Sequence, residues 1–329
     1  MRISIVIPVH NGAATLDGCL AAACCQDYPD YEVLLVDDAS TDATAAIAAR
    51  YPCRIVSLPG NQGAARARNI GAGEATGEVV FFTDADVRLP PDALALLAER
   101  FADPGVTGVV GLLAAAAPYP DFASNFKNLW MHYTYRRQPA EVGLFFTSAA
   151  AIRRGAFLAA GGFDESYRGA SETEDIELGQ RLWSSGERIV LDPRLAVEHW
   201  KRYTVGEVLR TDLRRSRGLV LILVRNWLGR TGRRHYASVP LTFGLSVPWA
   251  ALLALGLVAL PWLQGQAALL AALSYAFILG LNGRFLSFLT QVRGWRFGLQ
   301  SALFLPLDLF FAGLGIAVAL VDYARGRRY

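Results

Sequence analysis

Cysteine is scarce in this sequence, and its spacing does not fit a metal centre. The 329 residues include four cysteines, at positions 19, 24, 25 and 53, with no CxxC pair and no histidine placed to complete one. Structural zinc sites need closely spaced cysteine and histidine ligands, so we expect no zinc site. In a cytosolic compartment the four side chains are expected to stay reduced, as small and partly buried residues.

Glycine-rich phosphate-binding loops are also missing. No GxGxxG follows the first expected strand at residues 3–7, and no GxxxxGK(S/T) occurs anywhere. Such loops bind phosphates through backbone N–H groups at a helix start, so their absence argues against dinucleotide oxidoreductases and P-loop NTPases. The apolar run at residues 1–8 is too short for a secretory signal and is typical of a strand instead.

Charged residues are absent from residues 236–283. A bilayer core about 30 Å thick needs about 20 apolar helical residues, so this stretch is long enough for two spans, at residues 239–263 and 267–283 with a turn at 264–266. The alternative is a pair of buried core helices in a soluble domain. A third apolar segment, residues 299–321, is interrupted by Pro306 and Asp308, and it either spans or forms a re-entrant hairpin bent at Pro306. A carboxylate in an apolar segment is costly, which makes Asp308 a functional or pairing candidate.

Charge is unevenly distributed between the two parts of the chain. Residues 1–199 carry 16 Lys and Arg against 25 Asp and Glu, whereas residues 200–329 carry 16 against 4. Basic residues next to spans stay in the cytoplasm and attract anionic lipids, so we expect a multi-pass inner-membrane protein with a cytosolic N-terminal domain. Three full spans would put the basic residues 325–328 on the side of the membrane away from the cytoplasm, against the preference of basic residues for the cytoplasmic side. This favours the re-entrant hairpin. The basic residues lie beside the spans rather than in an aromatic groove, which argues against nucleic-acid binding.

Strand and helix signals alternate along residues 1–204. Strands are expected at residues 3–7, 32–36, 53–57 and 79–82, and helices at 13–26, 41–50, 63–75 and 92–101. Such alternation is typical of an α/β fold with a mostly parallel sheet covered on both faces. Further strands are expected at 143–152, 188–191 and 196–199. Residues 205–235 then form a basic amphipathic helix region suited to the membrane surface, and residues 236–329 form a membrane domain.

Polar residues follow the expected strands at the edge where α/β sheets bind ligands. The loops at residues 8–11, 37–38, 58–61 and 84–86 would line one crevice. Asp84 and Asp86 follow the strand at 79–82 with one residue between them, so they point the same way. Two such carboxylates repel unless a cation lies between them. A divalent cation chelated by a diphosphate resolves the repulsion; the alternative is an acidic turn that caps the next helix.

A second acidic pair, Glu174 and Asp175, begins an expected helix. Carboxylates near a helix N-terminus interact favourably with the helix dipole, by about 0.3–1 kcal/mol each, which is the structural interpretation of the pair. The functional interpretation is a general base at a helix start, opposite the cation site.

The order of these motifs resembles that of the family-2 glycosyltransferases of the GT-A fold, over roughly residues 1–200. The motifs that carry the resemblance are 4–11 (SIVIPVHN), 32–42 (EVLLVDDASTD), 61–69 (NQGAARARN), 83–86 (TDAD), 161–165 (GGFDE) and 174–175 (ED). The resemblance implies a nucleotide-diphospho-sugar donor of the UDP or GDP type and a Mg²⁺ or Mn²⁺ cofactor. Processive members of the family carry QxxRW after the base. That motif does not follow here, so we expect transfer of a single sugar.

The resemblance implies donor-binding roles by position. Asp38 would read the nucleobase beside the backbone of Pro8 and Val9, and Asp84 would approach the ribose. Arg66 would help to bind the nucleotide, unless it is a helix-surface residue. The remaining crevice residues expected to contact the donor are Asn11, Asp37, Asn61 and Ala85.

The resemblance also implies metal-binding and catalytic roles. Asp86, together with Asp84, would hold the cation that bridges the two phosphates. His199 is a candidate third ligand, although a single histidine after a strand is commonly structural. Asp175, with Glu174 beside it, would be the catalytic base of an inverting transfer, and the cation would stabilise the departing diphosphate.

The acceptor is expected to be a membrane lipid, because a basic amphipathic helix and apolar segments follow the catalytic domain. Polyprenyl phosphate, a lipid-linked sugar and a lipid hydroxyl are the alternatives, and a soluble acceptor stays open. Arg214, Arg215 and Arg217 would contact the donor diphosphate or a lipid phosphate. Two rival functions are a non-catalytic membrane scaffold and a nucleotidyltransferase. The second needs a glycine-rich basic loop that residues 8–14 do not provide.

Overall fold

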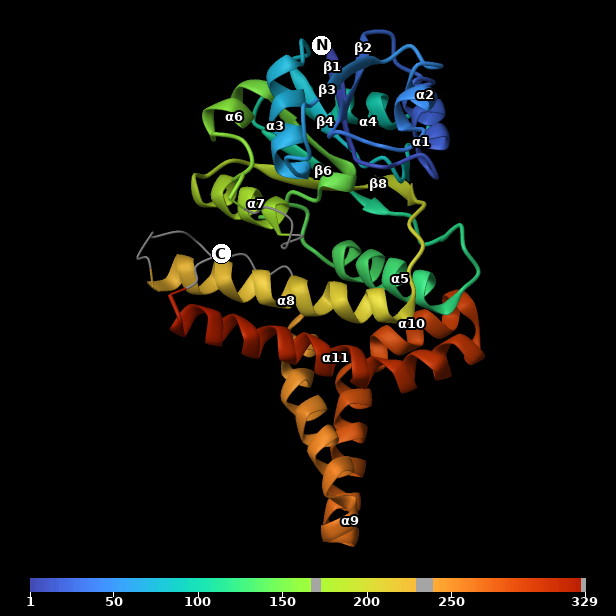
Figure 1. The fold of residues 1–329 in the computed structure, drawn as a ribbon, viewed down its shortest axis with the longest axis vertical. Helices are drawn as coiled ribbons and strands as arrows, with labels where there is room; N and C mark the ends of the chain where they lie inside the picture. The colour runs from blue at the N-terminus through green and yellow to red at the C-terminus, as the bar shows by residue number, and fades with distance from the viewer. Residues whose placement is uncertain (167–172, 229–238, 327–329) are drawn as a thin grey trace. The chain divides into compact units, whose positions relative to one another are not determined.

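The computed structural model describes residues 1–166, 173–228 and 239–326, and Figure 1 shows the ribbon. Within these ranges the chain forms two compact units. The sheet unit comprises residues 1–120 and 135–202, and the helical unit comprises residues 121–134, 203–228 and 239–326. Residues 229–235 of the predicted amphipathic region, and the predicted basic residues Arg327 and Arg328, lie outside the described residues.

The sheet unit is built on one eight-stranded sheet with the order β3-β2-β1-β4-β7-β6-β8-β5. The strands β1 to β4 pair in parallel, as predicted, whereas β7 is antiparallel to both of its neighbours. The result is a mixed, Rossmann-like α/β sheet. Its strands are β1 (Ile3–Val9), β2 (Tyr31–Asp37), β3 (Arg54–Ser57), β4 (Val79–Phe82), β5 (Val87–Arg88), β6 (Gly108–Leu113), β7 (Ala150–Arg153) and β8 (Ile189–His199).

Part of the sheet differs from the sequence-based expectation. β5 and β6 fall outside the expected strands, and the strand expected at 143–152 is short, because residues 147–149 form the 3₁₀ turn η1 (Thr147–Ala149) before β7. The strands expected at 188–191 and 196–199 are one strand, β8. The pairing of β8 with β6 continues past the residues between them, with a register shift between Val110 and Leu112. The Asp192 carboxylate there accepts hydrogen bonds from the Arg194 backbone N–H at 3.0 Å and from Arg100 Nε at 2.7 Å.

Helices pack on the sheet around a fully buried central strand (Figure 1). β1 is buried along its whole length, which explains its continuous apolar sequence. Beside β1, an aromatic cluster of Phe82, Phe145, Phe157 and Phe163 has ring centroids 5.2–6.1 Å apart. Phe82 ends β4, so this cluster fixes the start of the acidic loop. The helices are α1 (Leu16–Ala23), α2 (Thr44–Ala48), α3 (Ala64–Glu74), α4 (Ala93–Phe101), α6 (Arg154–Ala159) and α7 (Glu174–Ser184).

Gly71 sets how closely α3 approaches the sheet. A Cβ at this position would lie 2.4 Å from Val6 Cγ1 and 3.0 Å from Val36 Cγ2, whereas a Cβ at Gly73 would meet nothing within 4 Å. We expect Gly71→Ala to destabilise the fold by about 1–3 kcal/mol through overpacking. Gly73→Ala should stabilise it by about 0.5–1 kcal/mol through helix propensity. Thermal unfolding of both variants measures the difference, and equal melting temperatures would contradict the tight contact.

The helical unit contains five helices within the described residues. Residues 122–134 of α5 (Phe122–Arg136) pack against α9 and α10 through aromatic rings. Phe126 lies 6.0 Å from Phe285, and Trp130 lies 5.6 Å from Phe243, between ring centroids. The other helices of this unit are α8 (Val205–Leu228), α9 (Leu241–Leu281), α10 (Gly283–Arg293) and α11 (Trp295–Ala324).

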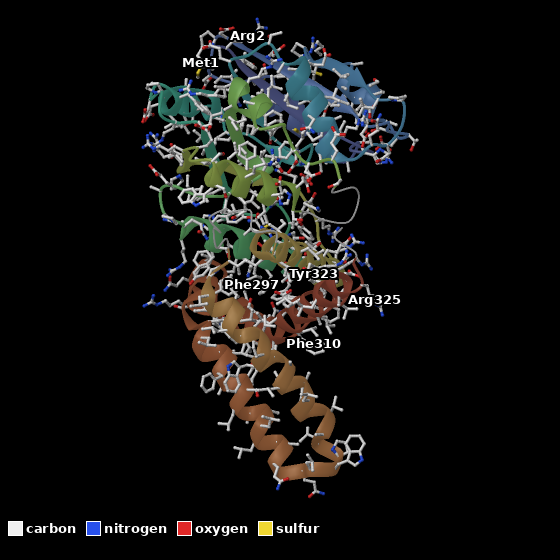
Figure 2. All side chains as sticks on the ribbon, turned by 90° about the vertical axis from the view of Figure 1, so that its left-hand side faces the viewer. Met1, Arg2, Phe297, Phe310, Tyr323 and Arg325 are labelled. Atoms are coloured by element: carbon white, nitrogen blue, oxygen red, sulfur yellow. The ribbon has the colours of Figure 1, made fainter. Side chains whose placement is uncertain are left out.

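The helix α9 is a hairpin of two apolar arms. The chain reverses at Gln264, whose φ of 36° and ψ of −107° are not helical. A Cβ at Gly256 would lie 3.0 Å from the Ala271 backbone nitrogen, so the arms touch through small residues. In Figure 2 the hairpin side chains point outward along its length, and Trp262 is 76% exposed. The two arms match the apolar segments predicted at residues 239–263 and 267–283. In the described chain α9 and α11 are long and apolar enough to cross a membrane.

The helix α11 is continuous, and the re-entrant hairpin expected from a bend at Pro306 is not formed. The backbone stays helical from Trp295 to Ala324. α11 runs beside α8 (Figure 1), so close that a Cβ at Gly315 would lie 2.1 Å from the Leu213 carbonyl oxygen. An ion pair of 2.7 Å between Arg217 and Asp322 also joins the two helices. This packing along its length keeps the helix intact where the proline removes one N–H donor.

Candidate active site

The loops after β1 and β2 are hydrogen-bonded to each other. Asn11 has a φ of 54°, in the left-handed region that asparagine tolerates better than most residues. Its Oδ1 accepts a hydrogen bond from the Thr41 N–H at 2.8 Å, and its N–H donates to Ser40 Oγ at 2.9 Å. Asp37 Oδ1 accepts the Ser40 N–H at 3.0 Å. Asn11 and Asp37 therefore shape this edge of the crevice, and their contact with the donor stays a prediction.

The Asp38 carboxylate joins these loops to the loop after β3. Its Oδ1 accepts the Gln62 N–H at 2.7 Å, and its Oδ2 accepts the Gly63 N–H at 2.8 Å. The side chain is buried, with 3% of the residue exposed. Each carboxylate oxygen has a second lone pair. An N–H group of a nucleobase can therefore donate a hydrogen bond to Asp38 while the loop N–H groups stay bound.

The remaining predicted donor-binding residues lie at the ends of these strands. Pro8 and Val9 end β1, and the Val9 carbonyl accepts the Asp38 N–H at 2.8 Å. Asn61 is exposed in the loop before α3, and Ala85 is partly exposed between the two aspartates that follow β4. The strand order thus brings the four predicted loops to one edge of the sheet.

A buried arginine links the two acidic motifs. Arg68 on α3 donates from Nη2 to Asp84 Oδ1 at 2.8 Å and from Nη1 to Glu174 Oε1 at 3.0 Å, and 6% of its side chain is exposed. Asp84 Oδ2 accepts a hydrogen bond from Ser148 Oγ at 2.6 Å. Burial alone would raise the pKa of Asp84, but the Arg68 charge and the Ser148 hydrogen bond hold that pKa below its usual range. The ion pair with Arg68 and the Ser148 hydrogen bond therefore favour the ionised form of Asp84 and fix its position.

Asp86 faces a different partner. Its Oδ1 lies 3.6 Å from His199 Nε2, and its carbonyl accepts the Trp200 N–H at 2.6 Å. Burial raises the pKa of Asp86, although His199 opposes this, and burial lowers the pKa of His199. A neutral imidazole and a carboxylate are both ligands for a divalent transition metal, so the pair fits one cation. In the described part of the chain, however, no three His, Cys, Asp or Glu side chains are grouped as a metal site. The nearby Asp84 is hydrogen-bonded to Arg68.

The two carboxylates at the start of α7 have different surroundings. Glu174 is paired with Arg68, and 14% of its side chain is exposed. Asp175 is half-buried, accepts the Ile176 N–H at 2.7 Å, and is close enough for its charge to raise the pKa of Arg68. Glu174 is therefore held by an ion pair, whereas Asp175 remains partly accessible.

The GGFDE segment is held against α3. Asn69 donates from Nδ2 to the Phe163 carbonyl at 2.9 Å and accepts the Phe163 N–H at 2.8 Å. Gly162 has a φ of 68°, and a Cβ there would lie 2.5 Å from Asn69 Oδ1, so the turn requires glycine. Arg66 pairs with Glu165 at 3.2 Å, with 41% of the Arg66 side chain exposed.

Three residues of the site were not identified from the sequence: Arg68, Asn69 and Ser148. Arg68 and Asn69 belong to the quoted segment 61–69, but nothing local distinguishes the buried Arg68 from the exposed Arg66. Ser148 lies in a segment expected as a strand. Arg68 lies on the same face of α3 as Ala65 and Ala67, which are buried. A search for basic residues on the apolar face of this helix would have pointed to Arg68.

The three predicted arginines of α8 lie in the helical unit. Arg214 is exposed, Arg217 is paired with Asp322, and the Arg215 guanidinium carbon lies 5.8 Å from the Trp130 ring centroid. Arg215 is buried, with 9% of the residue exposed. Contact of these arginines with a donor diphosphate or a lipid phosphate stays a prediction.

Comparison with known sequences covers the N-terminal part of the chain. The model of glycosyl transferase family 2 matches residues 4–159. The succinoglycan biosynthesis protein ExoO of Rhizobium meliloti is 36% identical over 101 residues, which are 30% of this chain and 29% of that protein. The match thus spans less than a third of the length of that relative.

Comparison with solved structures covers nearly the whole chain. A mannosyltransferase, PcManGT from Pyrobaculum calidifontis in complex with GDP-Man and Mn²⁺, is similar with a TM-score of 0.61 and 22% identity over 96% of this chain and 87% of that chain. TarS from S. aureus in complex with UDP-GlcNAc is similar with a TM-score of 0.51 and 15% identity over 99% of this chain and 93% of that chain. At these identities the likeness shows the fold, which is GT-A.

Proposed function

Because the chain belongs to glycosyl transferase family 2, we propose that it transfers a single sugar from a nucleotide-diphospho-sugar, with inversion, to a lipid at the cytosolic face of a membrane. The observation that carries the catalytic part is the buried Arg68, which holds Asp84 and Glu174 in one hydrogen-bonded unit. Arg68 thereby holds the proposed donor site beside β4 and the proposed base at the start of α7 in a fixed position relative to each other.

Asp175 is the proposed general base. Its carboxylate takes the proton of the acceptor hydroxyl as the hydroxyl oxygen forms a bond to the anomeric carbon. The bond from that carbon to the diphosphate breaks on the opposite face, and the nucleoside diphosphate leaves with the electron pair. A positioned base contributes about 10²–10⁴-fold to the rate. Glu174 acts through Arg68 as a positioning residue, because its carboxylate is already paired.

Asp86 and His199 are the proposed protein ligands of a divalent cation. When bound, the cation would supply positive charge to the leaving diphosphate. Two observations support this: the 3.6 Å separation of the two side chains and the Mn²⁺ in PcManGT. Because Mg²⁺ prefers oxygen ligands and Mn²⁺ also accepts imidazole, we expect Mn²⁺ to be preferred.

Removal of divalent metal with EDTA is expected to abolish transfer, and Mn²⁺ should restore it. His199→Gln should raise the Mn²⁺ concentration needed for half-maximal activity by about tenfold or more, since even residues outside the ligand set cost 10–100-fold in metal sites. Asp92→Asn, an exposed carboxylate before α4, is the control and should leave this concentration unchanged. Full activity in EDTA would contradict the metal proposal.

The lipid acceptor is supported by the helical unit. Both arms of α9 are apolar and mostly exposed, as suits contact with hydrocarbon. The helix α8 buries Val208 and Leu209 and exposes Arg214, which suits a helix at a charged membrane surface. Basic residues flank these helices, which favours the cytosolic face.

The test uses detergent-purified full-length protein, a membrane lipid extract, Mn²⁺ and a panel of radiolabelled UDP- and GDP-sugars. Label that enters the organic phase with wild type, and fails to do so with Asp175→Asn, is the expected result. Donor turnover with label confined to an aqueous product would indicate a soluble acceptor instead. Donor binding without any turnover would favour the scaffold function.

A further inference from the structure

The helix α11 exposes an apolar stripe along one side. Between Leu303 and Val321 every exposed residue of α11 is apolar. Six large apolar side chains lie on one face of the helix, because they follow each other at intervals of three, four or seven residues. They are Leu299, Leu303, Leu307, Leu314, Val318 and Val321, and each is 39–65% exposed. A contiguous apolar surface of this kind marks a place where a protein meets an apolar partner.

The two carboxylates of α11 are buried against α8. Asp308 shares a hydrogen bond with Asp212 of α8, and Asp322 pairs with Arg217 of α8 at 2.7 Å. Asp308 is 6% exposed and Asp322 is 7% exposed. The helix is therefore amphipathic, with its charged groups on the α8 side and its apolar stripe on the exposed side.

Contacts with α9 fix the direction of α11 relative to the hairpin arms. Tyr275 Oη donates a hydrogen bond to the Ala302 carbonyl at 3.3 Å, and a Cβ at Gly313 would lie 2.9 Å from Val247 Cγ1. Val247 lies six residues after the start of the first arm, and Tyr275 lies six residues before the end of the second. The arms thus touch α11 at equal depth but at residues 302 and 313, which are about 16 Å apart along it. α11 therefore runs across the arms, as both figures show.

The arms of α9 give the direction of the bilayer normal. The first arm, residues 241–263, is about 34 Å long at 1.5 Å per residue, which matches a bilayer core of about 30 Å. A helix that runs across such arms lies in the plane of the membrane. Its contacts are about 9 Å from the arm ends, and in-plane helices bury their apolar face by about 5–10 Å. In Figure 2, Phe310, on the same side of α11 as the stripe, points in the direction in which the hairpin extends.

A crossing by α11 would carry charged residues of α8 into hydrocarbon. The two helices pack along each other, and a Cβ at Gly315 would lie 2.1 Å from the Leu213 carbonyl oxygen. Arg210 and Arg214 of α8 are exposed, so they would enter the bilayer core with α11, where charge is costly. An in-plane α11 instead leaves both arginines at the membrane surface.

The charges at the two ends of α11 also favour the in-plane position. Arg296 lies at its start and Arg325 directly follows its end, and both are exposed. In a span, these two arginines would lie on opposite sides of the membrane, although basic flanks prefer the cytoplasmic side. In the membrane plane, both can contact anionic headgroups of the same leaflet.

We propose that α11 lies in the plane of the membrane, with its apolar stripe at the boundary between anionic headgroups and hydrocarbon. Among the described helices, only the arms of α9 then enter the bilayer core. Because the arms enter and return, the end of α11 lies on the same side of the membrane as residues 1–202. The proposal rests on the membrane location in the proposed function, but not on sugar transfer.

The first experiment measures the depth of α11 in the bilayer. Full-length protein with its four native cysteines replaced by alanine is reconstituted into vesicles of equal parts phosphatidylcholine and phosphatidylglycerol. A nitroxide on a single introduced cysteine reports depth through its collisions with oxygen and with a water-soluble nickel complex. The labelled positions on α11 are Leu299→Cys, Leu307→Cys, Leu314→Cys and Val321→Cys. All four are exposed, and circular dichroism checks that each variant is folded.

The four labels on α11 are expected to lie at one depth, within about 5 Å. If α11 crossed the bilayer, the two middle labels would lie about 10 Å deeper than the two outer ones. Leu241→Cys and Leu255→Cys, at exposed positions near the start and the middle of the first α9 arm, are the controls. Their depths should differ by about 15–20 Å, because that arm runs along the bilayer normal.

The second experiment compares the two sides of the membrane in intact and permeabilised cells, with a membrane-impermeant maleimide. One protein keeps only the exposed native Cys25 of the sheet unit, and the other carries only Arg325→Cys. The two cysteines are expected to react under the same condition. Opposite reactivity would place the end of α11 across the membrane and would overturn the proposal.

The depths also separate failure of this proposal from failure of the membrane location. A deep Leu255 label together with graded depths along α11 would overturn the in-plane helix alone. A Leu255 label in water would overturn the membrane location and the in-plane helix together. Stripe labels shielded from both collision reagents would show that protein, such as a second copy of the chain, covers the stripe, and would also overturn the proposal.

Discussion

Replacing Asp175 with asparagine is expected to lower kcat by about 10²–10⁴-fold and to leave the Kd of the donor nearly unchanged. The substitution keeps the size of the side chain and its place at the start of α7, but it removes the carboxylate that accepts the acceptor proton. Steady-state kinetics with the preferred donor measures kcat, and calorimetry with the same donor measures Kd.

The neighbouring Glu174→Gln is the matched comparison for this prediction. Glu174 is paired with Arg68 and is 14% exposed, so its loss should affect activity through the position of α7 and by a smaller factor. A larger loss of kcat in Glu174→Gln than in Asp175→Asn would reassign the base. Unchanged kcat in both variants would contradict acid–base catalysis by this motif.

Replacing Arg68 with methionine is expected to destabilise the sheet unit by about 3–5 kcal/mol, because removing one partner of a buried ion pair leaves the other charges uncompensated. Asp84 and Glu174 would then share a buried site without the positive charge of Arg68, which both now contact. Pulse proteolysis of the full chain measures the change in the free energy of unfolding. Adding Glu174→Gln to Arg68→Met should recover part of the loss, since one of the two unpaired charges is then removed.

Arg66→Met is the control for the loss of an arginine from the same helix. The Arg66 side chain is 41% exposed, and surface substitutions usually change stability by no more than about 0.5 kcal/mol. Equal destabilisation by the two substitutions would show that burial of Arg68 has no energetic consequence. No recovery in the double variant would show that the effect of Arg68 comes from packing and not from its charge.

The first half of the sheet was predictable because its strands are short, apolar and buried. The strand expected at 79–82 coincides with β4, and the carboxylates that follow it lie where the parallel topology puts them. β6 was missed because its glycines carry little strand signal. Gly111 is required by a contact that is not local, since a Cβ there would lie 2.3 Å from the Leu195 carbonyl oxygen.

The candidate site was predictable in its residue types but not in its pairing. Asp84 and Asp86 look equivalent in the sequence, yet one faces Arg68 and the other faces His199. Arg68 and Glu174 are 106 residues apart in the chain, and no periodicity reports a contact over that distance. Pro306 likewise suggests a bend from local rules, whereas packing of α11 against α8 keeps that helix continuous.

The hydrogen bonds among the loops after β1, β2 and β3 have a thermodynamic consequence for donor binding. Because Asn11, Ser40, Thr41 and Asp38 already hold these loops together, little backbone freedom remains to be lost when a nucleoside enters. Preorganised sites lose less conformational entropy on binding. The nucleoside diphosphate alone should therefore retain much of the affinity of the complete donor, and it should act as a strong product inhibitor whose release limits turnover at saturating donor concentration.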